Sequence, residues 1–256
     1  LPGDFSDSEP ECKISRFCPK SGDFGLRRID TFCMRTNESI ITLIMADYFV
    51  TIAGNIGVGK STLTARMAER LGWKPFFEAV EENPYLSDFY GDMQQWSFHS
   101  QAFFLSRRLH QHHDLLQHNG SVLQDRSVYE DAEIFARNLF RQGQMTERDW
   151  GTYHDLYKIL SVLVRPPDLV VYLKASVPTL LRRIGHRGRD YERSISSEYL
   201  DSLNVLYEQW VTSFTLCPVL TLETDNLDYV QNENHLDQII QRIQDRLHGK
   251  ETLAFD

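Results

Sequence analysis

The chain has 256 residues, of which 41% are hydrophobic and 25% are charged, so it can fill the core of one full-sized globular domain or two small ones. This composition excludes a collagen, a coiled coil and a chain that is disordered throughout. The formal net charge of −9 at pH 7 argues against a general binder of nucleic acids or membrane surfaces. An anionic ligand would therefore need a local positive site.

Apolar runs and cysteines indicate the compartment. The longest apolar stretch, Ile40–Met45, is far shorter than the roughly 18 residues that a membrane-spanning helix requires. The four cysteines are too few for a disulfide scaffold, so a reducing compartment is the default. We therefore predict a cytoplasmic protein with no membrane partner.

Residues 1–44 differ from the rest of the chain. They mix Gly, Pro, Ser and charges of both signs with no sustained period of 2 or 3.6, which is typical of a disordered segment. The chain begins with Leu1, whereas Met45 lies directly before the first convincing strand. We predict that residues 1–44 are a disordered upstream extension, included by a mis-chosen start, and that residues 45–256 form the domain.

From Asp47 onward, short apolar runs alternate with longer helical patterns, as expected for a parallel sheet with helices on both faces. We predict strands over residues 48–53, 73–77, 121–124, 168–174 and 217–222. We predict helices over residues 60–71, 94–118, 129–141, 146–163, 178–187, 196–215 and 231–248. No linker-like composition interrupts this region, so we expect one α/β domain with about five strands.

A glycine-rich motif follows the first of these strands and opens the first helix. It matches the pattern of a phosphate-binding loop, G-x-x-x-x-G-K-[ST], and consists of Gly54, Asn55, Ile56, Gly57, Val58, Gly59, Lys60 and Ser61, followed by Thr62. Glycines let backbone N–H groups curl around phosphate oxygens, and the helix N-terminus adds positive potential. Lys60 can reach the terminal phosphates and Ser61 can bind Mg²⁺. The motif predicts a P-loop NTPase fold.

Two carboxylates are predicted to lie near this loop. Glu78 ends the strand 73–77, and Asp125 ends the strand 121–124 and is followed by Arg126. Sheets of this kind bind ligands at the carboxyl ends of their strands. Phosphoryl transfer needs a proton acceptor, a metal ligand and cations for the developing charge, and these residues offer all three.

These motifs resemble the deoxyribonucleoside kinase family, and most of all its bacterial deoxyadenosine kinase-like branch, over about residues 47–248. The loop Gly54–Thr62 resembles the first motif of the family. Glu78-Ala79-Val80 resembles its Glu-Pro-Val motif, which holds the base for the nucleoside 5′-hydroxyl, and Asp125-Arg126-Ser127 fits its Asp/Glu-Arg-Ser signature. The resemblance implies a nucleoside kinase fold and ATP-dependent phosphorylation of a 2′-deoxynucleoside.

The resemblance also implies a nucleoside site on the predicted helix 94–118 and just before it. The family pattern places Tyr90 on the sugar 3′-hydroxyl and Gln101 on the base edge, and Arg108 and Asp131 fall at the family spacings. Gln101 and Arg108 are two helical turns apart, so they share one face. A Gln amide suits adenine and also cytosine. Asp131 could pair with Arg108 or accept from an exocyclic amine.

An arginine run near residue 187 resembles the lid of the family. Arg183, Arg187 and Arg189 would bind ATP phosphates, and Glu192 would bind the 3′-hydroxyl. A nucleic-acid patch is the alternative, but the acidic residues inside the run weigh against it. A lid that closes on phosphate explains cations beside a glycine, so we expect no nucleic-acid partner.

The histidines of helix 94–118 offer a second alternative, a metal site. His110, His112, His113 and His118 share this helix. No Cys or carboxylate lies at matching offsets, so we expect these side chains to be solvated at the helix end.

The predicted mechanism uses ATP and Mg²⁺ with Glu78 as the base, and prefers deoxyadenosine over deoxycytidine or deoxyguanosine. Asp125 would hold the metal with Ser61, and it is the second candidate for the base, because the roles of two nearby carboxylates are not assigned by sequence. Lys60, Arg126 and the lid arginines would hold the negative charge. The other functions considered are a silent nucleotide-binding subunit and a nucleoside-monophosphate kinase. The family resemblance suggests a homodimer that uses helix 94–118.

Overall fold

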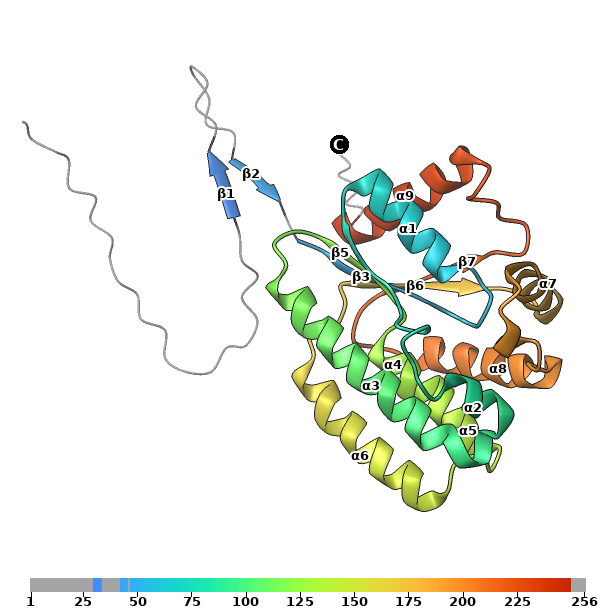
Figure 1. Ribbon diagram of the computed structural model, residues 1–256. Coiled ribbons are helices and arrows are strands. Elements are labelled where there is room, and N and C mark those ends of the chain that lie inside the picture. Colours follow the sequence, from blue (N-terminus) through green and yellow to red (C-terminus); the bar gives the residue numbers. More distant parts are fainter. Residues whose placement is uncertain (1–29, 34–41, 46, 250–256) are drawn as a thin grey trace, which may run out of the picture. The chain divides into compact units, whose positions relative to one another are not determined.

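The computed structural model describes residues 30–33, 42–45 and 47–249. The chain divides after Met45 into two compact units, whose elements are labelled in Figure 1. In the first unit, the short strands β1 (Asp30–Cys33) and β2 (Thr42–Met45) pair in antiparallel register. The sequence predicts no strand there, because its apolar runs are short and irregular. The remainder of the predicted disordered extension, residues 1–29 and 34–41, lies outside the described residues.

The second unit is built around a five-stranded sheet with the order β4-β5-β3-β6-β7. Its strands are β3 (Phe49–Gly54), β4 (Lys74–Phe76), β5 (Val122–Asp125), β6 (Leu169–Lys174) and β7 (Val219–Glu223). Neighbouring strands are parallel throughout this sheet. The central strand β3 is buried along its whole length, as its β-branched and aromatic residues require. The predicted parallel sheet is confirmed.

Helices cover both faces of this sheet (Figure 1). Helices α1 and α9 lie on one face and contact each other, whereas α3, α5, α6 and α8 lie on the other. The helices of this unit are α1 (Lys60–Leu71), α2 (Leu86–Gly91), α3 (Met93–Gln117), α4 (Val128–Glu130), α5 (Arg137–Arg141), α6 (Glu147–Leu163), α7 (Val177–Arg187), α8 (Ser197–Ser213) and α9 (Glu233–His248).

The main departure from the predicted elements is the helix expected over 129–141. It is a helical run of three parts, α4, the π-helical η1 (Asp131–Ala136) and α5. It begins with a capping box in which Ser127 and Glu130 satisfy each other's backbone N–H groups, which is a strong start signal. Helix α2 and the 3₁₀ turn η2 (Asp190–Glu192) are not predicted. They are too short for a hydrophobic period, and the residue before α2 makes no side-chain cap.

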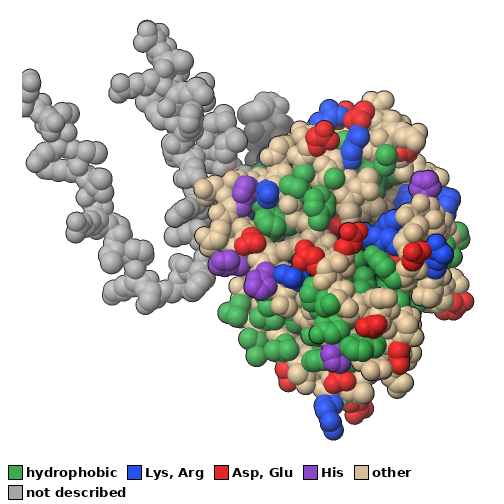
Figure 2. Space-filling view, in the orientation of Figure 1, with side chains coloured by type: hydrophobic (Ala, Val, Ile, Leu, Met, Phe, Trp, Pro, Cys, Tyr) green, Lys and Arg blue, Asp and Glu red, His purple; other side chains and the backbone are tan. Residues whose placement is uncertain are grey.

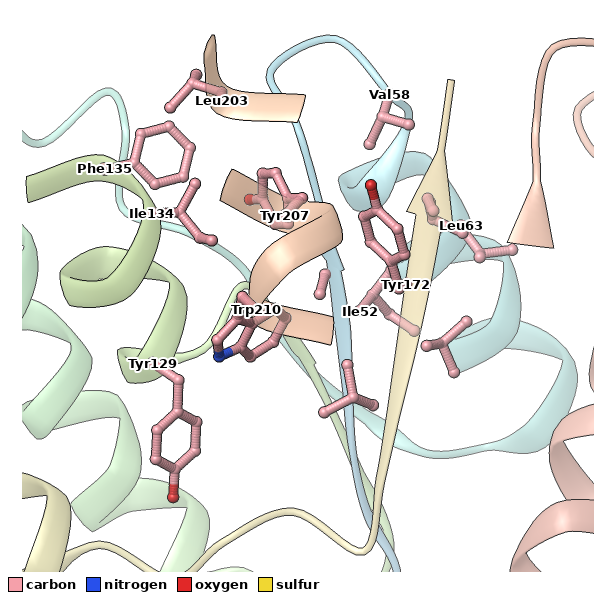
Figure 3. Close-up of a cluster of buried hydrophobic side chains, with 14 of the residues drawn as sticks. Ile52, Val58, Leu63, Tyr129, Ile134, Phe135, Tyr172, Leu203, Tyr207 and Trp210 are labelled. Atoms are coloured by element: carbon pink, nitrogen blue, oxygen red, sulfur yellow. The ribbon is translucent and has the colours of Figure 1, made fainter. Parts of the chain in front are cut away.

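The core of the second unit lies on both faces of the sheet, with residues of α1 and α9 on one side and of α8 on the other, and Figure 3 shows one part of it. Tyr172 of β6 and Tyr207 of α8 stack there, with ring centroids 5.5 Å apart and ring planes 15° apart. Both side chains are almost wholly buried. A buried hydroxyl needs a polar partner inside the protein, and that of Tyr207 lies against the Gly54 carbonyl and Glu130.

Within residues 30–33, 42–45 and 47–249, no helix is long and apolar enough to cross a membrane.

Candidate active site

The glycine-rich motif forms the turn between β3 and α1, as predicted. Gly57 and Gly59 have φ angles of 79° and 107°, which only glycine adopts without strain. A Cβ atom on Gly57 would lie 2.6 Å from the Ile184 side chain of α7. A Cβ atom on Gly59 would collide with the hydroxyl of Tyr229. The loop is thus packed closely between its own helix and the segments that follow β6 and β7.

Lys60 lies at the start of α1 with its ammonium group turned towards the loop. Its Nζ donates to the carbonyl oxygens of Gly54 (2.9 Å) and Asn55 (3.1 Å). Burial, and next the positive charge of Arg126, lower the pKa of Lys60 to about 8. An anion in the loop would raise that pKa again, so this lysine is poised to gain a negatively charged partner.

A cavity of about 220 Å³ opens beside this loop, at the carboxyl ends of the central strands. Parallel α/β sheets bind their ligands in this position. The cavity is lined by Ile56, Gly57, Gly59, Lys60, Ser61, Thr62, Glu78, Val80, Leu86, Phe89, Tyr90, Gln101, Phe104, Arg126, Asp131, Phe135, Arg187, Arg189, Tyr191, Glu192 and Tyr199.

Glu78 reaches this cavity from the segment after β4. Its carboxylate lies 2.7 Å from Nε of Arg126 and 3.7 Å from an Nη atom of Arg108. Burial alone would raise the pKa of Glu78, but Arg126, Arg108 and Lys60 together hold it below its usual value. Glu78 is therefore a carboxylate that stays ionised in the cavity wall.

Arg126 follows β5 in an unusual backbone conformation. Its φ angle is 69°, which is unfavourable for any residue other than glycine. The guanidinium lies 4.0 Å from the ring centroid of Phe135 and faces the carboxylate of Glu78. The strained backbone directs the buried guanidinium of Arg126 towards Glu78. An ordinary strand or helix conformation at this residue would direct it elsewhere.

Asp125 and Ser61 lie together at the edge of the loop. The Ser61 hydroxyl donates to Oδ2 of Asp125 at 2.5 Å, whereas the buried Oδ1 has no hydrogen-bond partner among the described residues. Burial raises the pKa of Asp125, and Lys60 opposes this. A hydroxyl and a carboxylate with one free oxygen fit Mg²⁺, which commonly takes one or two protein ligands beside phosphates and water. In the described part of the chain, no group of three or more His, Cys, Asp or Glu residues could hold a metal ion.

Two of the residues predicted at the base site, Gln101 and Asp131, line the cavity. Gln101 of α3 is buried in its wall. Nε of Arg108 donates to Asp131 at 3.1 Å, and its Nη1 donates to the Asp125 carbonyl at 2.9 Å. Of the two partners considered for Asp131, the structure shows Arg108. Burial raises the pKa of Asp131 against the effect of this arginine.

The predicted lid residues follow the end of α7. Arg187 forms a two-pronged ion pair with the buried carboxylate of Glu192, with N–O distances of 2.6 and 2.7 Å. Arg189 lies 3.6 Å from the same carboxylate and 3.1 Å from Glu81. Tyr191 stacks on Tyr90 with ring centroids 5.9 Å apart. The segment therefore contacts Tyr90, one of the residues predicted to bind the sugar.

Some predicted site residues do not line this cavity in the described structure. They are Gly54, Asn55, Val58, Arg108, Asp125 and Arg183. Arg183 donates to the carbonyl of Val58 and to Thr224, so it connects the P-loop to the segment after β7. Asn55 donates to Leu200 and Asn204 of α8 and acts in the same way. The prediction for His112 is wrong, because its Nε2 is buried and accepts from the Arg165 backbone N–H.

Sequence reasoning missed several residues around the site. Glu130 is completely buried and accepts from the backbone N–H of Gly54 at 3.1 Å and of Ser127 at 2.8 Å. Its spacing from Ser127 fits a capping box, and that signal could have found it. Tyr191 and Tyr199 line the cavity, but no local pattern distinguishes them from core tyrosines.

A phosphate loop, an ionised carboxylate beside it and several buried arginines together define a P-loop phosphotransferase. A family model for the deoxynucleoside kinases matches residues 50–248. The chain therefore belongs to the deoxynucleoside kinase family and is an enzyme, as the sequence motifs predict. Membership in this family supports ATP as its cofactor.

Relatives of the chain agree with this assignment. The deoxyadenosine/deoxycytidine kinase of Bacillus subtilis is 38% identical over 204 residues, which cover 79% of this chain and 94% of that protein. A deoxyguanosine kinase of Lactobacillus acidophilus is 34% identical over 216 residues, which cover 81% and 94%. The solved structure of deoxyadenosine kinase from M. mycoides with bound dATP has a TM-score of 0.69 and 31% identity, and the match covers 77% of this chain and 99% of that one.

Proposed function

We propose that this kinase uses ATP and Mg²⁺ to phosphorylate the 5′-hydroxyl of deoxyadenosine, with deoxycytidine and deoxyguanosine as weaker substrates. The observation that carries the proposal is the position of Glu78. Its carboxylate shares one cavity with Ile56, Gly57 and Gly59–Thr62 of the P-loop and stays ionised beside Arg126. An ionised carboxylate next to a phosphate loop is the arrangement that transfer to a hydroxyl requires.

In the proposed mechanism, Glu78 accepts the proton of the 5′-hydroxyl as its oxygen attacks the γ-phosphate in line. Arg126 orients Glu78 and offsets the charge that develops on the phosphoryl group. Lys60 exchanges its bonds to the loop carbonyls for contacts to phosphate oxygens. The positive φ angles of Gly57 and Gly59 let the backbone of the loop curl around the phosphates without strain.

Glu78 is favoured over Asp125 as the base by the surroundings of the two carboxylates. Glu78 lines the cavity, whereas Asp125 does not. The Oδ2 atom of Asp125 accepts from Ser61, and burial raises its pKa, which a bound cation would reverse. We therefore assign Asp125 and Ser61 to the metal. Mg²⁺ held there would shield the negative charge of the phosphates.

At the nucleoside end, we propose that Gln101 contacts the Watson–Crick edge of the base. Its amide NH₂ can donate to N1 of adenine while its carbonyl accepts from N6. The same two groups could pair with N3 and N4 of cytosine. Asp131 accepts a hydrogen bond from Arg108 and lines the same cavity as Gln101. Tyr90 and Glu192 bind the sugar. Arg187 and Arg189 bind the phosphates of ATP when the lid closes.

A steady-state kinase assay of the full chain with ATP–Mg²⁺ tests this function. The acceptors are deoxyadenosine, deoxyguanosine, deoxycytidine, thymidine and dAMP in parallel. We expect deoxyadenosine to be used best and thymidine worst, since thymine offers no exocyclic amine. Use of dAMP alone would instead indicate a nucleoside-monophosphate kinase. ATP binding without turnover of any acceptor would indicate a silent nucleotide-binding subunit.

We further propose that the kinase is a cytoplasmic homodimer. An apolar surface on α6 supports the dimer: Leu156, Ile159, Val162 and Leu163 are each at least 44% exposed, and Leu116 of the neighbouring α3 is 50% exposed. Figure 2 shows hydrophobic side chains gathered over the same region. Solvent-exposed apolar patches of this kind commonly mark protein interfaces.

Light scattering tests the dimer. We expect twice the 29.9 kDa mass of one chain, and the mass of one chain for Ile159→Lys. Leu216→Lys is the control, because Leu216 is similarly exposed but lies outside α3 and α6. A wild-type chain that runs as a monomer at all concentrations would contradict this proposal and leave the catalytic one intact. Cell fractionation tests the cytoplasmic location.

A further inference from the structure

Tyr207 of α8 and Glu130 of α4 form a buried polar link that no part of the proposed mechanism uses. The Tyr207 hydroxyl lies 2.8 Å from the Gly54 carbonyl and 2.9 Å from Oε1 of Glu130. Both side chains are fully buried and neither lines the cavity. Burying a hydroxyl and a carboxylate costs free energy unless each forms hydrogen bonds. The hydrogen-bond partners of Tyr207 and Glu130 therefore indicate what the two side chains do.

One end of this link holds the first residue of the P-loop. The backbone N–H of Gly54 donates to Oε1 of Glu130 at 3.1 Å. The carbonyl of the same residue accepts from Lys60 and lies next to the Tyr207 hydroxyl. Both polar groups of the Gly54 backbone are therefore fixed by buried side chains from outside the loop.

The other end holds Arg126. Oε2 of Glu130 accepts from the backbone N–H of Ser127 at 2.8 Å, directly after the strained residue. Nη1 of Arg126 lies 3.4 Å from the Tyr207 hydroxyl and donates to it. A backbone with a φ angle of 69° persists only where its surroundings over-determine it, and Glu130 and Tyr207 supply such contacts.

We propose that Tyr207 and Glu130 are positioning residues that fix the P-loop relative to Arg126. In the proposed mechanism the P-loop binds the phosphates of ATP, and Arg126 contacts the phosphoryl group that is transferred. The link therefore sets the distance between the P-loop and Arg126. This inference rests on the proposed phosphoryl transfer. Displacements of about 1 Å between catalytic groups can lower rates by about 10²-fold, which is why a link outside the cavity affects the reaction.

The core offers a matched control in Tyr172, which stacks on Tyr207 (Figure 3). The Tyr172 ring is also buried, but its hydroxyl donates to the half-exposed Glu208 at 3.1 Å, outside the link. Tyr172→Phe and Tyr207→Phe each remove one hydroxyl from the same stacked pair. They differ in which groups lose a partner, and only Tyr207→Phe affects Gly54, Glu130 and Arg126.

The test compares steady-state kinetics, thermal unfolding and binding of a non-hydrolysable ATP analogue for the full chain and both variants. We expect Tyr207→Phe to lower the melting temperature by a few degrees, as the loss of a buried hydrogen bond does. Tyr172→Phe should lower it by less, because its hydroxyl bonds to the half-exposed Glu208. We expect Tyr207→Phe to lower kcat by about tenfold, with KM for the deoxynucleoside changed less than about twofold. Tyr172→Phe should keep kcat within about twofold of the wild type. Equal, small losses of kcat in the two variants would overturn the proposal.

Glu130→Gln is the second variant, and it keeps the shape of the side chain while replacing an acceptor oxygen with an NH₂ group. That group would face the N–H of Ser127 or of Gly54, so the link is broken at one end. We expect a loss of kcat at least as large as that of Tyr207→Phe, together with weaker binding of the ATP analogue. A folded Glu130→Gln protein with wild-type kcat would also overturn the proposal. A wild-type chain without kinase activity would instead refute the proposed function, so the two failures are distinct.

Discussion

The two ends of the cavity hold their charged groups in different ways. On the P-loop side, Lys60, Arg126 and Glu130 are each at most 6% exposed and contact groups that belong to the protein's own framework. On the lid side, the side chains of Arg187 and Arg189 are 35% and 29% exposed, and Arg189 pairs with the exposed Glu81. The first end is built to stay in place, whereas the second can exchange its partners.

This contrast suggests different roles for the two ends of the cavity: stabilisation of the transition state at the buried end and exchange of substrates at the lid. Charges that stabilise a transition state act best when they need no reorganisation during the reaction, and the buried end meets that condition. Residues that must admit and release substrates need contacts that are cheap to break. The ion pair of Arg189 with the exposed Glu81 fits this role, because exposed pairs contribute little net free energy.

The largest expected effect tests the buried end. Glu78→Gln removes the proposed base while leaving the size of the side chain unchanged. We expect kcat to fall by about 10²-fold or more, with binding of an ATP analogue retained. Full activity in this variant would transfer the role to Asp125, and Asp125→Asn would then be the variant to lose turnover.

At the lid, we expect a smaller effect from Arg187→Gln. The variant removes one cation that we propose to bind phosphate, and it leaves the buried Glu192 with Arg189 as its remaining cationic partner. kcat/KM for ATP should fall by about tenfold, measured at saturating deoxynucleoside. Arg193→Gln is the control, because Arg193 is 77% exposed and pairs with Asp190 away from the cavity. An equal loss in both variants would show that the lid arginines act only through general charge.

A pH measurement probes how firmly the buried framework is held. Burial, and next the charge of Arg165, lower the pKa of His112 to about 4, against about 6.5 in an unfolded chain. The unfolded state therefore takes up a proton between pH 6.5 and 4 that the folded state does not, so stability falls as the pH falls through this range. We expect about 1 kcal/mol or more of stability to be lost between pH 7 and pH 5.

His112→Gln isolates this contribution, because Gln does not titrate and can still accept from the Arg165 N–H. Chemical denaturation at pH 7 and pH 5 should show a smaller pH dependence in the variant than in the wild type. The same pH dependence in both proteins would contradict the assignment to His112.

The smallest expected effect tests whether lid contacts are exchangeable. Glu81→Gln removes the partner of Arg189 on the neighbouring segment, so Arg189 becomes more available to phosphate. We expect KM for ATP to fall by no more than about threefold, and the difference from the wild type to disappear at high salt. Glu82→Gln is matched to it, because Glu82 pairs with Arg107 at a similar distance, 3.2 Å. An equal shift in both variants would remove Glu81 from this role.

Sequence reasoning succeeded where a local pattern carries the structure. The phosphate loop has a fixed spacing, and β3 and β6 have continuous apolar runs, so both were predicted close to their observed bounds. Motif resemblance also led to Glu78, Gln101 and Glu192, which the structure brings to one cavity. These residues lie on three separate segments, and only the tertiary fold brings them together.

The predictions failed where tertiary contacts decide a residue's role. Arg183 resembles a phosphate ligand in sequence, but Thr224 and the Val58 carbonyl occupy its guanidinium. His112 lies on a helix with three exposed histidines and differs from them only in facing Arg165. Tyr207 carries no signal at all, since its importance depends on a loop that precedes it by about 150 residues.

The strand order also has a consequence for how the chain is made. β3 is the first strand of the sheet to be synthesised, yet Gly54 pairs with Leu173 of β6, which is translated about 120 residues later. At about 5–20 residues per second, a ribosome needs roughly 6–24 s to cover that distance. Throughout this interval the phosphate loop lacks at least one of its two flanking strands, β5 and β6, so a nascent chain should gain nucleotide affinity only after β6 has emerged.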